Sequence, residues 1–346
     1  MSTQPRLKLA LIGLDRLGAI RARILSFQQP RIELVAACDT KSGSEVWAAT
    51  YLPPSVKFFA DTEDCMKNSG AQAVLISTAT ATHAPLICHA LDLGLHVMCE
   101  KPISVGVITA EILTKAASKP RQKFLVPFCR RYDDSYQAAK RMVESGSLGQ
   151  IHAAETTCLD QQDPTGFFVT FSTQSGGIFV DMGVHDVDIG RYFLDVKSEL
   201  TNPKKQVNRV IAMGQQAFAN GKVLTTHLGR TLTNGFEGMT RVCGTKGHSV
   251  INNNSPLNRV EIRDSYGVRA ATTPDAFALY DKSIINDLSE FADVVLDDNP
   301  LTCTPDDAYE AAEIATALQY SVRNGVPVYF DDNCLPIIEA AKVTCP

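Results

Sequence analysis

The sequence has no excess of positive charge and no long apolar run. The formal net charge of its 346 residues is −5, and Lys and Arg form no long basic run. A cationic surface for nucleic acid is therefore not expected. No stretch approaches the roughly 20 apolar residues of a membrane span. The apolar run in the opening "MSTQPRLKLALIGL" is too short for a signal peptide, and Gly13 interrupts it. We expect a cytoplasmic protein with no nucleic-acid and no membrane partner.

Paired cysteines are also missing. The ten cysteines show no C-x-x-C spacing, and several lie inside apolar, strand-like runs such as "LHVMCE". This usage indicates reduced, mostly buried thiols, as in the cytosol. A structural zinc site needs Cys and His clustered at short spacing, and the sequence offers no such cluster. We therefore expect no bound metal.

The length and the order of apolar segments predict two domains, because 346 residues exceed what one hydrophobic core usually holds. In the first part, the apolar runs "LKLALIG", "IELVAACD", "AQAVLIST" and "LHVMCEKP" alternate with helical patterns. After the first run, Leu17, Ile20, Ile24 and Phe27 recur at helical spacing and predict the buried face of a helix. This alternation predicts a parallel sheet flanked by helices, a Rossmann-type dinucleotide-binding domain over residues 1–125.

Near residue 150 the pattern changes to alternation in period two. Segments such as "IHAAETTCLDQQ", "KVLTTHLGRTL" and "NRVEIRD" predict an α+β domain with an open, largely antiparallel sheet that is covered on one face. Helical patterns cover residues 176–195, 283–298 and 305–325. We assign residues 126–346 to substrate binding and oligomerisation, with the last helix and strand placed either there or back against the Rossmann domain.

The stretch "LIGLDRLGAI" is close to a G-x-G-x-x-G phosphate-binding turn, but Asp15 replaces its middle glycine. Gly13 and Gly18 are the glycines that remain. An aspartate is a favoured N-cap, yet its carboxylate would compete with a pyrophosphate for the amides of the helix N-terminus. Either Asp15 weakens cofactor binding, or it turns outward and Arg16 offsets its charge. We expect binding that is weakened but not abolished.

Two other polar residues end predicted strands, where ligands of such sheets bind. Asp39 follows the second strand, and an acidic residue there can accept both ribose hydroxyls of NAD and repel the 2′-phosphate of NADP. Lys101 follows the strand "LHVMCE" and precedes a proline. A lysine there can bond a substrate oxygen and stabilise a developing alkoxide, although an ordinary surface lysine would fit the local sequence equally well.

The helical segment 176–195 carries a polar stripe. Asp181, His185, Asp188 and Tyr192 are spaced to lie along one helical face. A histidine between two carboxylates fits a general base with orienting partners. A buried helix with internally satisfied polar groups is the alternative. The paired arginines in "FCRRYDDSY", Arg130 among them, suit either ligand recognition or a salt-bridged strand-to-helix junction.

Four motifs together carry a family resemblance. They are the turn at Gly13, E-K-P at 100–102, F-x-R-R-Y-D at 128–133 and D-x-x-x-H-x-x-D at 181–188. Each is weak alone, but four in this order are fairly specific. From about Leu7 to Phe330 the sequence resembles the glucose–fructose oxidoreductase / inositol dehydrogenase / rhizopine catabolism (Gfo/Idh/MocA) family. Within this family, the sequence most resembles inositol 2-dehydrogenase-like members of fungal type.

The resemblance implies an NAD-dependent oxidoreductase that acts on a secondary hydroxyl of a sugar or cyclic polyol. It implies that His185 takes the hydroxyl proton, that Lys101 bonds the same oxygen and tunes the histidine, and that Asp181 orients the site. The cofactor is expected to be NAD, with NADP less favoured. The implied cofactor-binding residues are Gly13, Asp15, Arg16, Leu17, Gly18, Asp39, Ser77, Thr78, His83, Glu100 and Pro102. The implied substrate or supporting residues are Arg130, Gln161, Asp163 and Asp188.

The resemblance also implies a homodimer or homotetramer formed through the C-terminal sheet. Here the connection from Ala212 to Phe218 is shorter than in related sequences, which usually carry an additional strand. A missing strand would leave a sheet edge or reshape the dimer face. Two other functions stay open. One is a non-catalytic sugar or nucleotide sensor, favoured by Asp15 and the short connection. The other is a biosynthetic tailoring enzyme that returns NAD to its starting state in each cycle.

Overall fold

The computed structural model divides into two compact units. The first unit contains Met1–Tyr132 and Lys282–Tyr309, and the second contains Asp133–Asp281 and Glu310–Pro346. The helix predicted at residues 283–298 therefore belongs to the first unit. The structure describes residues 5–103, 112, 116, 119, 121–163, 165–166, 175–195, 207, 209–211, 216–219, 222–233, 235–253, 255–265, 267–331 and 336–337.

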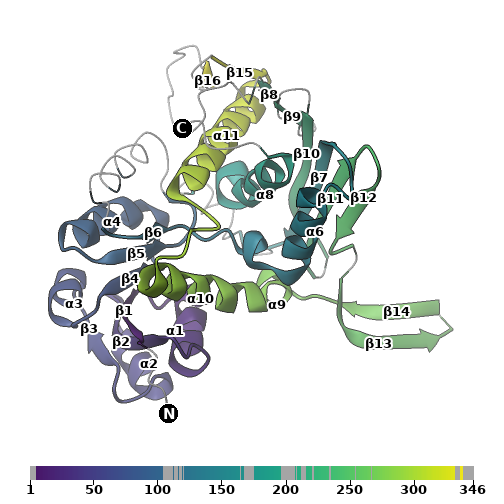
Figure 1. The fold of residues 1–346 in the computed structure, drawn as a ribbon. Coiled ribbons are helices and arrows are strands. Elements are labelled where there is room, and N and C mark those ends of the chain that lie inside the picture. The colour runs from purple at the N-terminus through teal and green to yellow at the C-terminus, as the bar shows by residue number, and fades with distance from the viewer. Residues whose placement is uncertain are drawn as a thin grey trace. The chain divides into compact units, whose positions relative to one another are not determined.

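Within the described residues, six strands form the sheet of the first unit, in the order β3-β2-β1-β4-β5-β6, and every neighbouring pair is parallel. The strands are β1 (Leu7–Ile12), β2 (Ile32–Cys38), β3 (Lys57–Phe59), β4 (Ala73–Ile76), β5 (His96–Cys99) and β6 (Phe124–Leu125). The helical segments are α1 (Arg16–Phe27), α2 (Ser44–Tyr51), α3 (Thr62–Asn68), η1 (Thr80–Thr82), α4 (His83–Asp92), η2 (Cys129–Tyr132) and α10 (Asp281–Asp297). The predicted Rossmann domain is confirmed (Figure 1).

The central strand shows why the sequence folds this way. Leu9 and Leu11 of β1 have no exposed surface, and Ile12 has 1 %. A strand that is buried on both faces needs apolar residues at every position, which is why β1 reads as a continuous apolar run. The order places β1 and β4 side by side although α1, β2 and β3 separate them in sequence. Ligands of such sheets bind at the carboxyl ends of these strands.

Helix α1 departs from the prediction at one end. Ile24 is buried as predicted, but Phe27 is 66 % exposed. Arg21 is instead among the buried residues of the helix, with 2 % of its surface exposed. The apolar spacing alone missed this, because an arginine is buried only when other parts of the chain supply charged partners.

Helix α10 joins the first unit through polar contacts with the region around α1. The side chain of Gln29 donates from Nε2 to the carbonyl oxygen of Ile285 at 2.7 Å. Arg31 Nη1 lies 2.5 Å from Asp293 Oδ1. The two helices lie side by side (Figure 1). A segment some 260 residues away in sequence thus completes the Rossmann unit.

The second unit has an eight-stranded sheet among its described residues, in the order β12-β11-β7-β10-β9-β8-β15-β16. Only its β7–β10 pairing is parallel, so the predicted open, largely antiparallel sheet is confirmed. The strands are β7 (Ile151–Gln161), β8 (Arg209–Ile211), β9 (Gln216–Ala219), β10 (Lys222–Leu232), β11 (Glu237–Gly244), β12 (His248–Ile251), β15 (Val328–Phe330) and β16 (Pro336–Ile337). The helical segments are α6 (Asp134–Glu144), η3 (Phe179–Gly183), α8 (Val184–Leu194), α9 (Ala276–Leu279) and α11 (Pro305–Asn324), whose first residues belong to the first unit.

The short connection that begins at Ala212 does not interrupt this sheet. Residues 212–215 lie outside the described residues. On either side of them, β8 and β9 pair with each other, and β9 also pairs with β10. The sheet is therefore continuous from β10 to β15 through these two strands.

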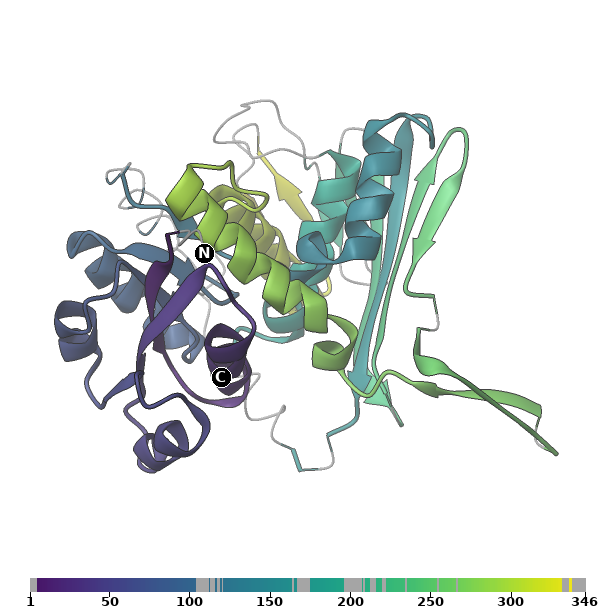
Figure 2. The same ribbon diagram turned by 60° about the horizontal axis from the view of Figure 1, so that its bottom comes forward.

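Helix α8 packs against β7 and β10 at short range (Figure 2). A Cβ atom added at Gly190 would lie 2.4 Å from Cδ2 of Leu224, so the absence of a side chain brings the helix close to the strand. Along β7, residues that face the interior alternate with residues that face the opposite side of the sheet. Ala154, Thr156 and Cys158 of β7 are 1–2 % exposed. Period-two alternation in the sequence predicts this one-sided cover.

A two-stranded ribbon projects from the second unit (Figures 1 and 2). It consists of β13 (Pro256–Asp264) and β14 (Gly267–Thr272), which in the described part of the chain pair only with each other. Every residue of β14 is exposed. The period-two pattern predicts the first of these strands but not the second.

We predict that truncating Phe193 destabilises the fold far more than truncating Phe27. Phe193 has no exposed surface, and its ring lies 6.2 Å from that of Tyr136. The substitution Phe193→Ala should lower the free energy of unfolding by about 3–5 kcal/mol, and Phe27→Ala by less than about 1 kcal/mol. Urea unfolding followed by circular dichroism measures both. Equal losses would contradict the burial of α8.

Candidate functional site

The turn between β1 and α1 can be built only with glycine at two positions. Gly13 has φ of +96°, a conformation that L side chains rarely adopt. A Cβ at Gly13 would lie 2.4 Å from the carbonyl oxygen of Ser77, and one at Gly18 would lie 2.1 Å from the carbonyl oxygen of Gly13. The first turn of α1 thus lies directly against the end of β1, where Leu17 is half-buried. This is the close packing that lets backbone amides reach a pyrophosphate.

Asp15 occupies the N-cap position of α1, but its side chain caps nothing. It makes no hydrogen bond with the helix amides. The side chain is 76 % exposed, and Oδ1 accepts a hydrogen bond from Nζ of Lys41 at 2.7 Å. This contact raises the pKa of the Lys41 ammonium. Lys41 supplies the counter-charge where Arg16 was expected; Arg16 itself is exposed.

The outward position of Asp15 answers the question that its sequence position raises. A carboxylate on the helix amides would occupy the donors that a pyrophosphate needs. A carboxylate bound to Lys41 leaves those donors to a ligand. Of the two interpretations of Asp15, the geometry supports the outward one.

Asp39 ties the same turn to the end of β2. Its Oδ2 accepts a hydrogen bond from the amide of Leu14 at 2.7 Å, and its Oδ1 accepts one from the amide of Lys41 at 2.8 Å. Each carboxylate oxygen can accept more than one hydrogen bond. The contacts hold Asp39 beside the glycine turn in the place from which an acidic side chain reaches the ribose hydroxyls of NAD. The glycine turn, which has no side chains at Gly13 and Gly18, and the carboxylate of Asp39 together fit NAD.

The loop after β4 is closed by a buried histidine. His83 is 1 % exposed, and its two ring nitrogens face backbone carbonyls. Nδ1 lies 2.9 Å from the oxygen of Pro102, and Nε2 lies 3.1 Å from the oxygen of Thr78. Burial lowers the pKa of this histidine. His83 therefore joins the loop after β4 to the loop after β5. Ser77 is buried beside Gly13.

The E-K-P motif follows β5. The side chain of Glu100 is directed into the unit, where Oε1 accepts a hydrogen bond from Nε of Arg21 at 2.5 Å. Glu100 is 8 % exposed, whereas Lys101 is half-buried. Glu100 and Lys101 are thus adjacent residues in different surroundings. The resemblance places Glu100 among the cofactor-binding residues, and nothing in the sequence indicates its partner Arg21.

In the second unit, the predicted polar stripe begins in η3 and continues into α8. Asp181 and His185 are half-buried, while Asp188 has no exposed surface. The stripe therefore divides into an accessible part at its start and a buried part further along.

Arg230 lies on β10, and its pairing with Asp181 was not predicted from the sequence. Its Nη2 lies 2.7 Å from Oδ2 of Asp181, and both side chains are 17 % exposed. This ion pair restricts the orientation of the Asp181 carboxylate. Its only sequence signal is an arginine near the end of a strand in a run of alternating residues, which is also the pattern of many solvated strands.

The remaining predicted substrate residues have other surroundings. Arg130 lies in η2 of the first unit and is 2 % exposed. Gln161 ends β7 and is exposed. Asp163 Oδ1 accepts hydrogen bonds from the amide and the hydroxyl of Thr165, at 2.9 and 2.6 Å. Asp163 thus stabilises a local turn.

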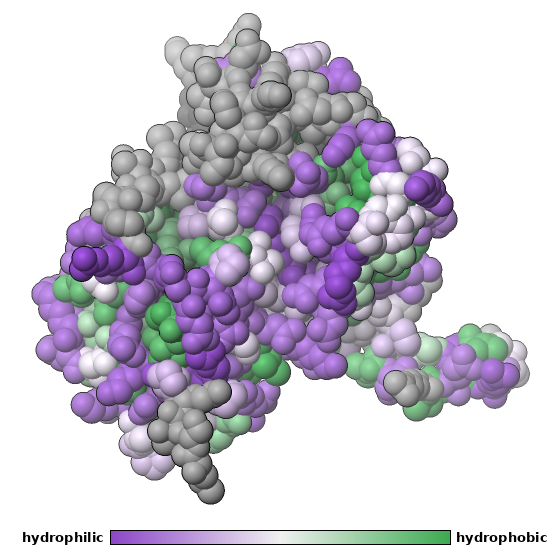
Figure 3. All heavy atoms as spheres, in the orientation of Figure 1, coloured by the Kyte–Doolittle hydropathy of each residue, from purple (hydrophilic) through white to green (hydrophobic). Residues whose placement is uncertain are grey.

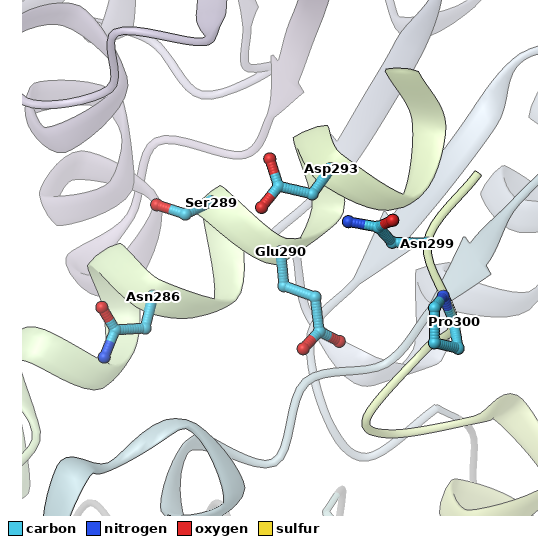
Figure 4. Close-up of a pocket in the computed structure, with 6 residues that line it drawn as sticks. All are labelled: Asn286, Ser289, Glu290, Asp293, Asn299 and Pro300. Carbon is cyan, nitrogen blue, oxygen red and sulfur yellow. The ribbon is translucent and has the colours of Figure 1, made fainter. Parts of the chain in front are cut away.

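A polar pocket of about 380 Å³ lies along α10 (Figure 4). It is lined by Asn286, Ser289, Glu290, Asp293, Asn299 and Pro300. Its central carboxylate, Glu290, accepts hydrogen bonds from the amide and the hydroxyl of Thr302. None of the predicted site residues lines it. Among the described residues, no group of three His, Cys, Asp or Glu could hold a metal ion, and no helix is long and apolar enough to cross a membrane.

Comparisons with known proteins agree with both halves of the chain. Residues 7–128 match the oxidoreductase family with an NAD-binding Rossmann fold, and residues 136–250 match the GFO/IDH/MocA C-terminal domain. A scyllo-inositol 2-dehydrogenase (NAD(+)) of Bacillus subtilis is 29 % identical over 336 residues, which cover 94 % of this chain and 97 % of that protein.

Solved structures show the same similarity over the whole fold. Myo-inositol 2-dehydrogenase from Lactobacillus plantarum matches with a TM-score of 0.86 and 29 % identity, covering 95 % of this chain and 100 % of the other. Scyllo-inositol dehydrogenase from Lactobacillus casei, with bound NAD(H) and scyllo-inositol, matches with a TM-score of 0.84 and 26 % identity, covering 94 % and 99 %.

We predict that Asp15 has little influence on cofactor affinity. The variant Asp15→Asn should change the dissociation constant of NAD by less than about threefold, because an exposed, paired charge interacts weakly with its surroundings. Lys41→Met should weaken NAD binding, whereas Asp15→Asn should not, because the loss of Lys41 leaves the Asp15 carboxylate without its counter-charge. Calorimetric titration measures both. A gain of tenfold or more in Asp15→Asn would mean that the carboxylate does compete with the pyrophosphate.

Proposed function

The chain belongs to the Gfo/Idh/MocA oxidoreductase family, and from this premise we propose that its substrate is a cyclic polyol of the inositol class. The protein is an NAD-dependent oxidoreductase that acts on a CH–OH group. In the proposed reaction a hydride passes between the nicotinamide and a secondary hydroxyl of the polyol. The similarity to inositol dehydrogenases along nearly the whole chain supports this substrate class.

The observation that carries the proposal is the accessible pair at the start of α8. Asp181 and His185 are half-buried polar residues in a segment that is otherwise buried, and Arg230 fixes the direction of Asp181. A general base must be reachable by the substrate and oriented by its neighbours. A purely structural helix would have no need of an accessible histidine beside a fixed carboxylate.

We assign the chemical roles as follows. Bound NAD supplies the hydride acceptor. His185 accepts the hydroxyl proton as the carbon–hydrogen bond breaks. Lys101 donates a hydrogen bond to the same oxygen and stabilises the negative charge that develops there. Asp181 accepts a hydrogen bond from a further hydroxyl of the polyol and so orients the ring. In the reverse direction His185 returns the proton to the carbonyl oxygen.

Four other residues take supporting roles in the proposal. Asp188 and Arg130 are both buried and would stabilise the elements that carry the chemistry. Gln161 and Asp163 lie at and after the end of β7, where hydrogen-bonding groups suit a hydroxylated ligand. The carboxylate of Asp39, bound to the turn, supports NAD in preference to NADP.

The outward side chain of Asp15 bears on the alternative functions. The case for a non-catalytic sensor depended partly on a carboxylate that obstructs the cofactor. Because Asp15 is bound to Lys41, that argument loses its basis. A tailoring enzyme with recycled NAD would use the same residues but would release no NADH.

We also propose self-association through the second unit, as a homodimer or homotetramer. The ribbon β13–β14 exposes four large apolar side chains: Leu257 at 51 %, Val260 at 61 %, Ile262 at 49 % and Val268 at 64 %. Figure 3 shows apolar surface on the projecting ribbon. An isolated two-stranded ribbon is marginally stable in water. Burial against a second copy of the chain would stabilise it beside the open sheet.

The catalytic assignment predicts a large loss of turnover when either group is removed. With NAD and a panel of inositols, hexoses and pentoses, wild type should turn over an inositol fastest. Lys101→Met and His185→Asn should each lower kcat by about 10²–10⁴-fold, while the dissociation constant of NAD changes by only a few-fold. NADH absorbance measures turnover, and calorimetry measures binding.

The control for this experiment is His248→Asn, which changes an exposed histidine on β12 and should leave kcat unchanged. NAD binding without turnover on any substrate would favour the sensor. Fluorescence of bound NADH without its release would favour the tailoring enzyme. Full activity in either Lys101→Met or His185→Asn would remove that residue from the mechanism.

The assembly proposal predicts that a charge on the ribbon lowers the molecular mass in solution. The double variant Val260→Lys, Ile262→Lys should dissociate dimers or tetramers into smaller species, because burying two ammonium groups opposes association. Light scattering after size-exclusion chromatography measures the mass. Val46→Lys is the matched control, since Val46 is 70 % exposed on the first unit. An unchanged mass of the ribbon variant would place the interface elsewhere.

A further inference from the structure

Three charged side chains meet inside the first unit. Arg21 of α1 is 2 % exposed, Glu100 after β5 is 8 % exposed, and Asp287 of α10 has no exposed surface. Nη1 and Nη2 of Arg21 donate to Oδ1 and Oδ2 of Asp287, each at 2.9 Å. Nε of Arg21 donates to Oε1 of Glu100 at 2.5 Å. One guanidinium thus bridges two carboxylates that come from segments far apart in the sequence.

Stability alone does not explain this cluster. A buried ion pair is often no more stabilising than apolar residues of the same volume, because desolvation of the charges offsets their attraction. Burial raises the pKa of Asp287 to about 6 even though the facing guanidinium of Arg21 opposes the rise. Apolar side chains at all three positions would avoid that cost. The charged cluster instead fixes an orientation. Two parallel hydrogen bonds from the guanidinium of Arg21 to one carboxylate hold the guanidinium plane in place.

Asp287 fixes the orientation of the Arg21 guanidinium, and the oriented guanidinium in turn positions the side chain of Glu100. Because both Nη atoms are held by one carboxylate, the Nε–H group points to a single place, the carboxylate of Glu100. The backbone amide of Glu100 also donates to the carbonyl oxygen of Ile76 at 2.9 Å. The side chain and the backbone of Glu100 are therefore both anchored.

Lys101 lies between two anchored residues. On one side is Glu100, and on the other is Pro102, whose carbonyl oxygen faces Nδ1 of the buried His83 at 2.9 Å. With both neighbours held, the backbone of Lys101 has little freedom. Arg21 also belongs to the helix that begins at the cofactor turn, and it lies three residues after Gly18.

We propose that Arg21 is a positioning residue for Lys101, linking the helix of the cofactor turn to the E-K-P segment through Glu100. The proposal rests on the proposed function only in that it takes Lys101 to act on the substrate oxygen. Arg21 touches neither substrate nor cofactor in this role. Its contribution is to keep the Lys101 ammonium where the developing negative charge forms.

The test compares Arg21→Lys with Arg31→Lys. Arg21→Lys keeps the positive charge but loses the fork that contacts Asp287 and Glu100 together. Arg31→Lys is the matched control, because Arg31 pairs with Asp293 and Asp297 on the same α10. We expect Arg21→Lys to lower kcat about tenfold or more, since small misplacements of a catalytic group are costly. NAD affinity should change by less than about threefold, and Arg31→Lys should keep the kcat of wild type.

A second readout does not depend on turnover. The rate at which Lys101 is modified by a lysine-selective acylating reagent is followed by peptide mass spectrometry across a range of pH. Arg21→Lys should change the rate and the pH midpoint for Lys101, and Arg31→Lys should not. If Arg21→Lys fails to fold, Asp287→Asn replaces it, because asparagine keeps the shape of the partner and removes one acceptor charge. The same direction of change is expected.

The outcomes separate the two proposals. A lower melting temperature in Arg21→Lys with unchanged kcat and unchanged Lys101 labelling would show a structural role and overturn the positioning role. Changed labelling in a protein that turns over no polyol would uphold the positioning of Lys101 and reject the proposed substrate class.

Discussion

The close contact between backbone segments at the carboxyl end of β1 is the constraint on which the candidate site depends. Side chains at Gly13 and Gly18 would lie within 2.4 Å of backbone carbonyl atoms, so α1 begins against the end of the strand. This placement presents the helix N-terminus to a ligand, and it brings the amide of Leu14 to the carboxylate of Asp39. It also directs Arg21, one helical turn further on, into the interior. The glycine turn, the position of the Asp39 carboxylate and the buried charge cluster are therefore consequences of one packing arrangement.

The carboxylates of the first unit show how surroundings decide the role of one chemical group. Asp15 is exposed and bound to the side chain of Lys41. Asp39 is half-buried and bound to two amides, which fixes it beside the turn. Glu100 is buried against a guanidinium. An exposed, solvated charge interacts weakly with a bound anion, whereas a fixed carboxylate can accept the hydroxyls of a ribose. The aspartate that departs from the glycine motif is thus the most exposed of the three carboxylates.

In the second unit, the same principle separates Asp181 from Asp188. Both lie on the stripe that the sequence displays, yet Asp188 has no exposed surface, whereas Asp181 is half-buried and pairs with Arg230. Glycine again sets the distance between elements, since Gly190 brings α8 close to β10, the strand that carries Arg230. Because a fold does not fix the substrate, substrate choice depends on such side-chain arrangements rather than on the sheet itself.

The sequence by itself determined the order of strands and helices, the glycine turn, the acidic residue after β2 and the stripe that contains His185. These features follow from local periodicity and from residue types with few conformational alternatives. Only the tertiary structure decided the direction of Asp15, the burial of Arg21 in place of Phe27, the partner of Asp181 and the pairing of β14 with β13. Each of these depends on residues that other segments bring into contact. Arg21 meets Asp287 across 266 positions, and Asp15 meets Lys41 across 26. Hydrophobic spacing carries no information about such pairs, because the energy of a charge depends on which partner the fold places beside it.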